Sequence, residues 1–382
     1  MRKNTFSIYL GAILLMASHV AGAASSGAKA DMPGGIKVAD VVDVDVNLSA
    51  SNARTGLDLH YPGATFLRLH FVAGDLPAGS RVHLVTSDDE QWIDAQALLE
   101  GGEHGYSAMT MDGGDVHVSV LGADGQSASA QSLLRIDRVD VGFRPIDEVP
   151  VVLPSAVIDI DQRRPAVCYR ESAPAAYRHA QAVARTYNAG WVGTAWRVGP
   201  ENRMLTNHHV MGNDQNPAAF EIWFGYEHAS CEGTATQPGV KVRGGSRLEG
   251  DAGLDFQLFT INDAQFREIA KFGHLGLDVG PLSNGQVIYI PQHGLGRPKQ
   301  LGLFVDGGGR CTVTAQVGNL GRYTCDTEGG SSGSPVIDWN TNRVVVLHNS
   351  AAGRANQGNR INVIWPRIQR HFAGGQVPVG SP

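Results

Sequence analysis

The stretch 326–336, Asp-Thr-Glu-Gly-Gly-Ser-Ser-Gly-Ser-Pro-Val, constrains the chain most strongly, because small residues surround one serine and an apolar run follows. A serine that attacks a carbonyl carbon must project from a tight turn, and backbone N–H groups must face the carbonyl oxygen. Gly330 and Gly333 permit turns that a Cβ would obstruct. Ordinary loops between strands have a similar composition, so a catalytic role requires a base and an acid elsewhere.

A candidate base and a candidate acid are both present, and both precede the serine in the chain. Met-Leu-Thr-Asn-His-His-Val at 204–210 ends an apolar strand with histidine, and Leu-Asp-Phe-Gln-Leu-Phe at 254–259 begins another strand with Asp255. The order His, Asp, Ser is that of the chymotrypsin-type catalytic triad. Asp251 is the competing acid. Asp255 is preferred because the apolar strand after it would bury its carboxylate beside the imidazole.

The two motifs resemble those of bacterial chymotrypsin-fold serine endopeptidases. Thr-Asn-His-His-Val resembles their Thr-Asn-x-His-Val, and Gly-Ser-Ser-Gly-Ser-Pro resembles their Gly-x-Ser-Gly-Ser-Pro. The glutamyl and lysyl endopeptidases are the most similar branches, and the resemblance covers roughly residues 166–375. It implies that Ser332 is the nucleophile and that the N–H groups of Gly330 and Ser332 form the oxyanion hole. No cofactor and no metal are implied.

The same resemblance identifies His209 as the base, since it directly precedes Val and lies three positions after Thr206. His208 is expected to point away, as neighbours in an extended segment do. Many animal proteases carry Asp immediately before the nucleophile, where it pairs with a freed amino terminus. Here that position is Ser331, so this activation ion pair is not available and any latency needs another device.

Substrate specificity is expected to depend on Thr327 and on the segment His348, Asn349, Ser350 and Ala351, which should also pair with substrate as an added strand. Thr327 with His348 resembles the carboxylate-binding pair of glutamyl endopeptidases, although lysyl endopeptidases can show the same residue types.

Nearby charges leave the preferred P1 residue open. Arg354 and Arg360 favour an acidic P1 residue, whereas Asp326 lies at the offset where a trypsin pocket carries its Asp, which favours a basic one. Small or apolar P1 residues are the third alternative. Acidic preference is the leading expectation.

Residues 1–23 have the pattern of a signal peptide, with Arg2 and Lys3, a short apolar core and the small-residue site Ala-Gly-Ala. The core is too short to span a bilayer, which needs about 20 apolar residues. We therefore expect a secreted protein, extracellular or periplasmic, with no membrane association after signal removal. The net charge of −6 gives no basic field for nucleic acid.

An even number of cysteines in an exported protein indicates disulfides, and four cysteines allow three connectivities. The cysteines are Cys168, Cys231, Cys311 and Cys325. The pairings Cys168–Cys231 and Cys311–Cys325 are favoured, because the second pair flanks an apparent hairpin. A metal site lacks the Cys-x-x-Cys or paired-His spacing it would need.

The region before the protease motifs alternates between apolar and polar residues with a period of two, as half-buried strands do. The segments 66–72, 81–85 and 116–121 have this pattern, and Gly/Asp turn clusters separate them. Short strands at such spacing favour a β-sandwich. The segment Tyr61-Pro62-Gly63-Ala64-Thr65-Phe66 resembles one in the pro-regions of some lysyl-type proteases, and a lectin-like module is the competing interpretation.

Charge differs between the two halves of the chain. Residues 24–165 carry 21 acidic and 10 basic side chains, whereas residues 166–382 carry 16 acidic and 19 basic ones, so the net charges are −11 and +3. Attraction that weakens with salt would suit a front domain acting as intramolecular chaperone or inhibitor. The acidity alternatively serves only solubility. A cut between about 154 and 167, for example after Asp159 or Asp161, would release the domain.

The sequence therefore predicts an all-β chain in which a β-sandwich-like domain precedes a two-barrel antiparallel chymotrypsin-like protease domain. The expected divisions are a signal peptide at 1–23, a pro or accessory domain at 24–153, a linker at 154–167 and the protease domain at 168–375. One clear helix is expected near the start of the protease domain, at 175–185. The expected function is hydrolysis of protein or peptide substrates through an acyl-enzyme. The alternative from another class is a secreted non-catalytic binding protein on a protease fold.

Overall fold

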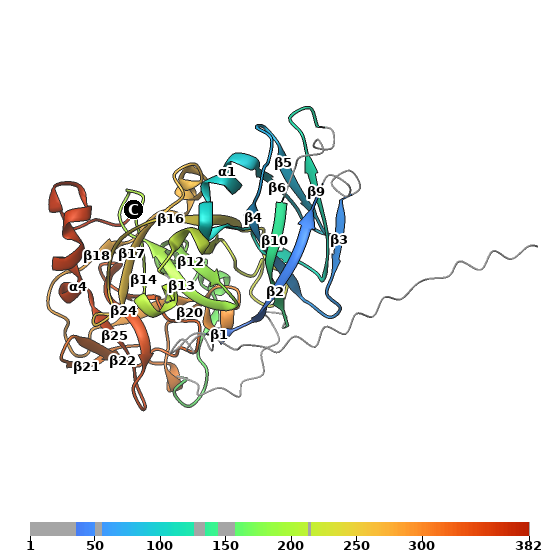
Figure 1. Cartoon of the computed structure of the whole chain (residues 1–382). Helices are drawn as coiled ribbons and strands as arrows, with labels where there is room; N and C mark the ends of the chain where they lie inside the picture. The colour runs from blue at the N-terminus through green and yellow to red at the C-terminus, as the bar shows by residue number, and fades with distance from the viewer. Residues whose placement is uncertain (1–35, 50–55, 126–133, 144–156, 213–214, 382) are drawn as a thin grey trace, which may run out of the picture. The chain divides into compact units, whose positions relative to one another are not determined.

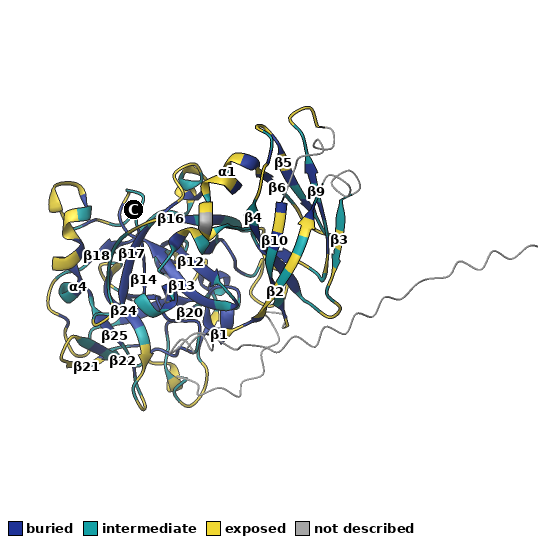
Figure 2. Ribbon diagram, in the orientation of Figure 1, coloured by how far each residue is buried: buried dark blue, intermediate teal, exposed yellow. Residues whose placement is uncertain are grey.

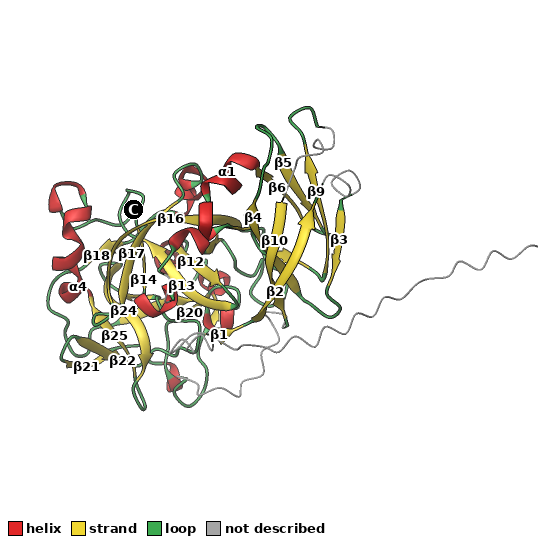
Figure 3. Cartoon of the chain, in the orientation of Figure 1, coloured by secondary structure: helices red, strands yellow, loops and turns green. Residues whose placement is uncertain are grey.

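The computed structural model describes residues 36–49, 56–125, 134–143, 157–212 and 215–381. Residues Met32–Pro382 form one compact unit, and the expected signal peptide lies outside the described residues. Strands dominate, and helices are few and short (Figure 3). None of the helices in the described part of the chain is long and apolar enough to cross a membrane.

The amino-terminal region is a β-sandwich, as the sequence predicts. One sheet contains β2 (Ala39–Leu48), β10 (Leu134–Gly142), β4 (Phe66–Ala73), β7 (Tyr106–Ser107) and β8 (Met111–Asp112). The other contains β3 (Leu57–His60), β9 (Asp115–Leu121), β5 (Arg81–Val85) and β6 (Glu90–Asp94), and the helix α1 (Ala95–Glu100) follows it. The inward side chains of both sheets share one core, which includes Phe71, Val82, Val118 and Ile136.

The first barrel is a closed antiparallel sheet of six strands, to which one further strand is added (Figure 1). The six are β12 (Val183–Asn188), β13 (Trp191–Arg197), β14 (Met204–Thr206), β15 (Glu221–Phe224), β16 (Val240–Asp251) and β17 (Phe256–Ile261). The pairing of β13 with β14 closes the barrel. The added strand is β1 (Ile36–Lys37), which pairs with the start of β13.

The second barrel carries residues 326–334, the nucleophile loop, named for the role expected of Ser332. Its sheet runs through β11 (Arg164–Pro165), β20 (Gln300–Gly302), β19 (Ile288–Gln292), β23 (Pro335–Asp338), β24 (Arg343–Ala351), β25 (Asn356–Arg360), β22 (Leu320–Tyr323) and β21 (Val313–Val317). The short strand β18 (Gly276–Leu277) runs parallel to β24. A bridge between Val287 and Thr312 brings the β19 and β21 ends of the sheet together.

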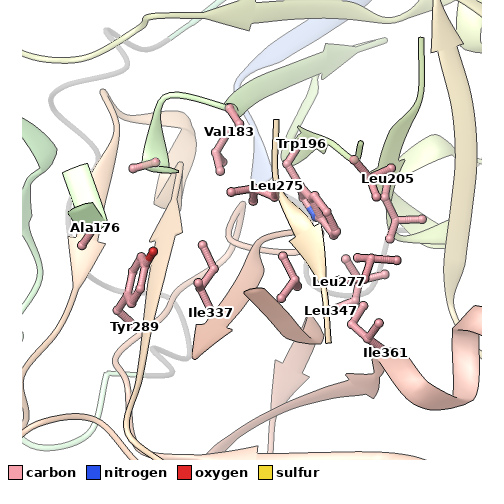
Figure 4. Packing of buried hydrophobic residues seen from close by; sticks show 14 of the residues in the cluster. Ala176, Val183, Trp196, Leu205, Leu275, Leu277, Tyr289, Ile337, Leu347 and Ile361 are labelled. Carbon is pink, nitrogen blue, oxygen red and sulfur yellow. The ribbon is translucent and has the colours of Figure 1, made fainter. Parts of the chain in front are cut away.

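A single hydrophobic core joins the two barrels and thereby fixes the geometry of anything built between them. Trp196 and Leu205 come from the first barrel, and Tyr289, Ile337 and Leu347 come from the second (Figure 4). Their strands are buried along most of their length (Figure 2). The helix α4 (Ile361–Ile368) closes this core with its own buried isoleucines.

Two local expectations need correction. The helix expected over 175–185 is α2 (Pro174–Ala180), and Val183–Asn188 is strand β12, because tertiary pairing with β13 outweighs the helical composition of this segment. Residues 24–45 have the composition expected of a flexible leader, but Ile36–Lys37 and Ala39–Leu48 form the strands β1 and β2, and the part before residue 36 lies outside the described residues. The helix α4 was missed because it is short and contains Pro366.

Both favoured disulfide pairings are present. Cys168 is bonded to Cys231, and Cys311 is bonded to Cys325, with Cα–Cα distances of 4.7 and 5.0 Å. The first ties the start of the protease region to the first barrel. The second lies at the base of the β21–β22 hairpin, just before the nucleophile loop.

The sandwich contacts the first barrel through buried polar groups as well as through β1. Glu221 of β15 is 1% exposed and accepts hydrogen bonds from the Thr110 N–H at 2.6 Å and the Thr110 hydroxyl at 2.8 Å. The ammonium of Lys241 donates to the Thr110 carbonyl at 2.6 Å. The Tyr187 hydroxyl donates to the buried carboxylate of Asp140 at 2.9 Å. These groups belong to the interface interior, where salt screening is weak.

We expect the sandwich to remain bound after a cut in the chain between 144 and 156. A site for a sequence-specific protease placed there, in a Ser332→Ala background, should yield fragments that co-elute on size exclusion at both 0.15 M and roughly 1 M NaCl, because β1–β13 pairing and buried hydrogen bonds resist screening. Glu221→Ala should weaken the association, since it removes the acceptor of both hydrogen bonds from Thr110. Separation of the unmutated fragments at high salt would instead indicate docking by surface charge.

Candidate active site

His209 and Asp255 meet because β14 pairs with β17, and each residue lies just beyond the paired segment. The His209 ring Nδ1 lies 2.8 Å from Asp255 Oδ2, and the His209 backbone N–H donates to Asp255 Oδ1 at 3.1 Å. The Asn207 side-chain amide donates to the Asp255 carbonyl at 2.8 Å. Both carboxylate oxygens therefore hold one residue, which fixes the tautomer and orientation of its ring.

The backbone at Asp255 is unusual, with φ +43°, a left-handed conformation that non-glycine residues rarely adopt. Asp251, the competing acid, shapes the turn before it: its Oδ1 accepts the N–H groups of Gly253 and Leu254 at 2.8 and 2.9 Å. Asp251 also pairs with Arg367 at 3.0 Å. The structure thus gives Asp251 a supporting position and brings Asp255 to the imidazole.

His208 and His209 lie in a single helical turn, α3 (His208–Met211), and not in an extended segment. The expectation that His208 and His209 alternate as neighbours in a strand is therefore wrong. His209 is nevertheless the histidine that contacts Asp255. Burial lowers the pKa of His208.

Ser332 is 3% exposed, and its hydroxyl donates to the Asn349 carbonyl at 3.5 Å. The His209 Nε2 atom has no hydrogen-bond partner among the described residues. The structure consequently joins His209 to Asp255, whereas no hydrogen bond among the described residues joins Ser332 to His209. Catalytic hydrogen bonds are often long or misaligned without substrate.

Thr194 of β13 holds the nucleophile loop against the first barrel. Its N–H donates to the Ser332 carbonyl at 2.9 Å, and its hydroxyl donates to the Gly330 carbonyl at 3.0 Å. Its carbonyl accepts a hydrogen bond from the Thr206 hydroxyl at 2.7 Å, and Thr206 lies three residues before His209. Thr194 was not identified from the sequence, where the one sign of its role is a lone hydroxyl in an apolar strand.

The two glycines of the loop adopt left-handed conformations, with φ +91° at Gly330 and +89° at Gly333. A Cβ at Gly333 would lie 2.0 Å from the Thr194 carbonyl oxygen, so only glycine fits there. The N–H groups of Ser331 and Gly333 donate to carbonyls at 3.0 Å. Those of Gly330 and Ser332 have no acceptor among the described residues, which leaves two donors for a substrate oxygen.

Two of the expected specificity residues, Thr327 and His348, are buried and contact partners that the sequence did not identify. The Thr327 hydroxyl donates to Asn356 Oδ1 at 2.8 Å, and the Asn356 amide donates to the Cys325 carbonyl at 2.6 Å. The Tyr323 hydroxyl lies 2.5 Å from His348 Nδ1. Asn349, Ser350 and Ala351 continue β24 towards solvent.

Asp326 is 2% exposed, and its carboxylate is already occupied. Its two oxygens accept the backbone N–H groups of Ile158 and Gln162 at 2.8 and 2.9 Å. Burial raises the pKa of Asp326, opposed by these two hydrogen bonds. The side chain therefore binds the segment that precedes the protease region.

Comparison with known proteins agrees with this architecture. Residues 193–347 match the family model described as "Trypsin-like peptidase domain", a span that contains His209, Asp255 and Ser332. Residues 193–347 are therefore similar to a trypsin-like peptidase domain. A curated relative, "Secreted RxLR effector protein 73" of Plasmopara viticola, is 26% identical over 306 residues, which cover 75% of this chain and 74% of the relative.

Two solved structures show a weaker likeness to this chain. A Glu endopeptidase in complex with MPD is 19% identical, with a TM-score of 0.43 over 58% of this chain and 100% of the other. An inactive form of Rv3671c from M. tuberculosis H37Rv is 15% identical, with a TM-score of 0.41 over 59% of this chain and 100% of the other.

We expect His348 to remain neutral throughout the working pH range. Burial, and then the charge of His209, lower the pKa of His348 to about 3. Below about pH 6.5, His348 therefore binds a proton in the unfolded chain but stays neutral in the folded chain. Protonation thus favours the unfolded state, and the free energy of unfolding falls as the pH drops towards 3. In histidine-labelled protein, the resonance lost in His348→Gln should not titrate between about pH 4.5 and 8. The same residue in urea-unfolded protein should titrate normally, and a folded-state transition near 6.5 would contradict the assignment.

Proposed function

We propose that this chain is a secreted serine endopeptidase in which His209, Asp255 and Ser332 act through an acyl-enzyme. The observation that carries the proposal is the pair of hydrogen bonds from His209 to Asp255, within a trypsin-like domain whose Ser332 loop offers two unpaired N–H groups. Two disulfides and a relative named as a secreted effector support export. Cleavage after residue 23 would be tested by amino-terminal sequencing of secreted material.

The reaction needs the Ser332 hydroxyl to change its hydrogen-bond partner. The Ser332 hydroxyl leaves the Asn349 carbonyl and turns to His209 Nε2, which accepts its proton as Oγ attacks the scissile carbonyl carbon. Asp255 stabilises the imidazolium, and the N–H groups of Gly330 and Ser332 bind the developing oxyanion. His209 then gives the proton to the departing amine, which leaves the acyl-enzyme. Water, activated by the same imidazole, hydrolyses it.

Ser332→Ala should lower kcat on peptide substrates by at least about 10⁴-fold while the protein stays folded, because members of a triad act as a unit. His209→Ala should be comparably severe. His208→Ala is the matched control in the same helical turn and should keep most of the activity, since His208 makes no hydrogen bond to Asp255. A fluorophosphonate probe should label the wild type and not Ser332→Ala. Wild-type activity in Ser332→Ala would refute the assignment.

For specificity we propose acidic P1 residues, bound by hydrogen-bond donors in the region of Thr327 and His348. Asp326 does not supply a counter-charge for a basic P1 residue, because backbone donors occupy its carboxylate. Arg354 pairs with Asp159, and Arg360 donates to Gln316 and to the Gly318 carbonyl, so both arginines are engaged elsewhere. Since His348 is neutral, recognition rests on hydrogen bonding and not on an imidazolium.

A peptide library with varied P1 should give kcat/KM in the order Glu above Gln above Lys. Thr327→Val should reduce the Glu preference, because Thr327 and Asn356 lose their mutual hydrogen bond. Thr324→Val is the control, because Thr324 lies in the same segment as Thr327 and its hydroxyl donates to the Thr312 carbonyl. A wild-type preference for Lys or Arg would exclude acidic specificity and favour the basic alternative.

A non-catalytic binding role is the second candidate. It is favoured by the relative named as an effector and by the Ser332 hydroxyl bonding to Asn349 instead of His209. Failure of wild-type protein to react with fluorophosphonate would support this role. Labelling at Ser332 would exclude it.

A further inference from the structure

The nucleophile loop carries two acidic residues, Asp326 and Glu328, and both are held by one segment that precedes the trypsin-like match. That segment is 158–163, which the sequence placed in a linker. Ser331, next to the nucleophile, is uncharged, so its side chain offers no ion pair that could hold the loop. The loop's two charges are at 326 and 328, and each has partners in 158–163.

The contact with Asp326 uses backbone donors from both ends of the segment. The Ile158 N–H donates to Oδ1 at 2.8 Å, and the Gln162 N–H donates to Oδ2 at 2.9 Å. Just beyond the segment, Arg164 and Pro165 pair with β20. The segment is therefore fixed at both ends and curves around one carboxylate.

The contact with Glu328 is a buried ion pair. The Arg163 side chain is 1% exposed and its NH1 lies 2.5 Å from Glu328 Oε1, while the Glu328 side chain is 6% exposed. Arg163 also donates to both oxygens of Asp161, at 2.9 and 2.7 Å. Arg297 donates to Glu328 from the other side at 3.0 Å. A buried pair of this kind is costly to break, because the remaining charge is left without its partner.

Gly294 shows how closely the surrounding chain packs on this pair. A Cβ on Gly294 would lie 2.4 Å from Glu328 Oε1 and 2.6 Å from Arg163 NH1. The neighbouring Leu295 N–H donates to the Gly329 carbonyl. The ion pair and the oxyanion loop are thus held against the same backbone.

Glu328 is connected directly to the residues that would hold the oxyanion. Its carbonyl accepts the Ser331 N–H at 3.0 Å, and its N–H donates to the Ser331 hydroxyl at 3.2 Å. That hydroxyl donates to Gln292 Oε1 at 2.5 Å. These bonds enclose Gly330, whose N–H is one of the two unpaired donors. A displacement of Glu328 would therefore turn the Gly330 peptide.

We propose that segment 158–163 keeps the oxyanion loop in its catalytic shape, with Arg163 as the positioning residue acting through Glu328. This inference rests on the proposed protease function. It has a consequence for maturation: a cut after Asp159 or Asp161 divides the segment, whereas a cut before 157 preserves it. Activity should therefore require that maturation spare residues 158–163.

The test compares Arg163→Ala, Arg163→Lys and Glu328→Gln in the full chain. Arg164→Ala is the matched control, since Arg164 is the adjacent arginine and is exposed. For Arg163→Ala we expect kcat to fall by about ten-fold or more, towards the 10²–10³-fold loss typical of a missing oxyanion donor, with KM changed by less than about three-fold. Arg163→Lys should restore part of kcat, Glu328→Gln should resemble Arg163→Ala, and Arg164→Ala should match the wild type.

Hydrogen exchange over 326–334, measured in a Ser332→Ala background, gives a readout independent of activity. Arg163→Ala should accelerate exchange there while strands β19 and β24 keep their protection. Because a general loss of stability would accelerate exchange in those strands too, their protection distinguishes a local effect from a less stable variant. Unchanged kcat and unchanged exchange in Arg163→Ala would overturn the inference. A wild type that fails to react with fluorophosphonate would overturn the proposed function instead, and the exchange experiment would still decide whether Arg163 holds the loop.

Discussion

The active site depends on the contact between Thr194 and the nucleophile loop. Thr194 lies on β13, yet its N–H and hydroxyl bind the carbonyls of Ser332 and Gly330, and its own carbonyl accepts a hydrogen bond from Thr206. The approach is so close that a Cβ at Gly333 would lie 2.0 Å from the Thr194 oxygen. Because β13 also pairs with β14, which leads to His209, this strand contacts both the loop of Ser332 and the strand before His209. Residues of both barrels share the core that lies between them.

The sequence was most informative where a residue type has few alternative uses. A histidine after an apolar strand and an aspartate before one indicated His209 and Asp255, which the fold brings into contact, and glycines around a serine indicated the tight turn at Ser332. The reasoning failed where tertiary contacts overrode local pattern. Val183–Asn188 became a strand by pairing with β13, and His208 and His209 formed a helical turn despite following β14. Thr194, Asn356 and Arg163 were missed because each acts through partners distant in sequence.

Net charge does not reveal which contacts join the two halves of the chain. The opposite signs predict attraction that weakens with salt, and among the described residues the contacts include strand addition and buried groups such as Glu221 and Asp140. Burial raises the pKa of Asp140, but the pKa of Glu221 is lowered, because Lys241 and Arg68 outweigh its burial. The contribution of a charge pair inside an interface to stability depends on the geometry of its partners, which composition alone does not predict.

The segment before the barrels explains how the loop is ordered without a charged residue beside the nucleophile. An isolated Gly-rich loop gains little from its own contacts and loses much conformational entropy on ordering. Asp326 and Glu328 offset this cost by binding groups that the rest of the fold already holds: the Ile158 and Gln162 amides, Arg163 and Arg297. On our proposal, ordering therefore requires residues outside the stretch that carries His209, Asp255 and Ser332. A fragment that began at the first barrel strand would contain His209, Asp255 and Ser332 and still lack the partners that shape the oxyanion site.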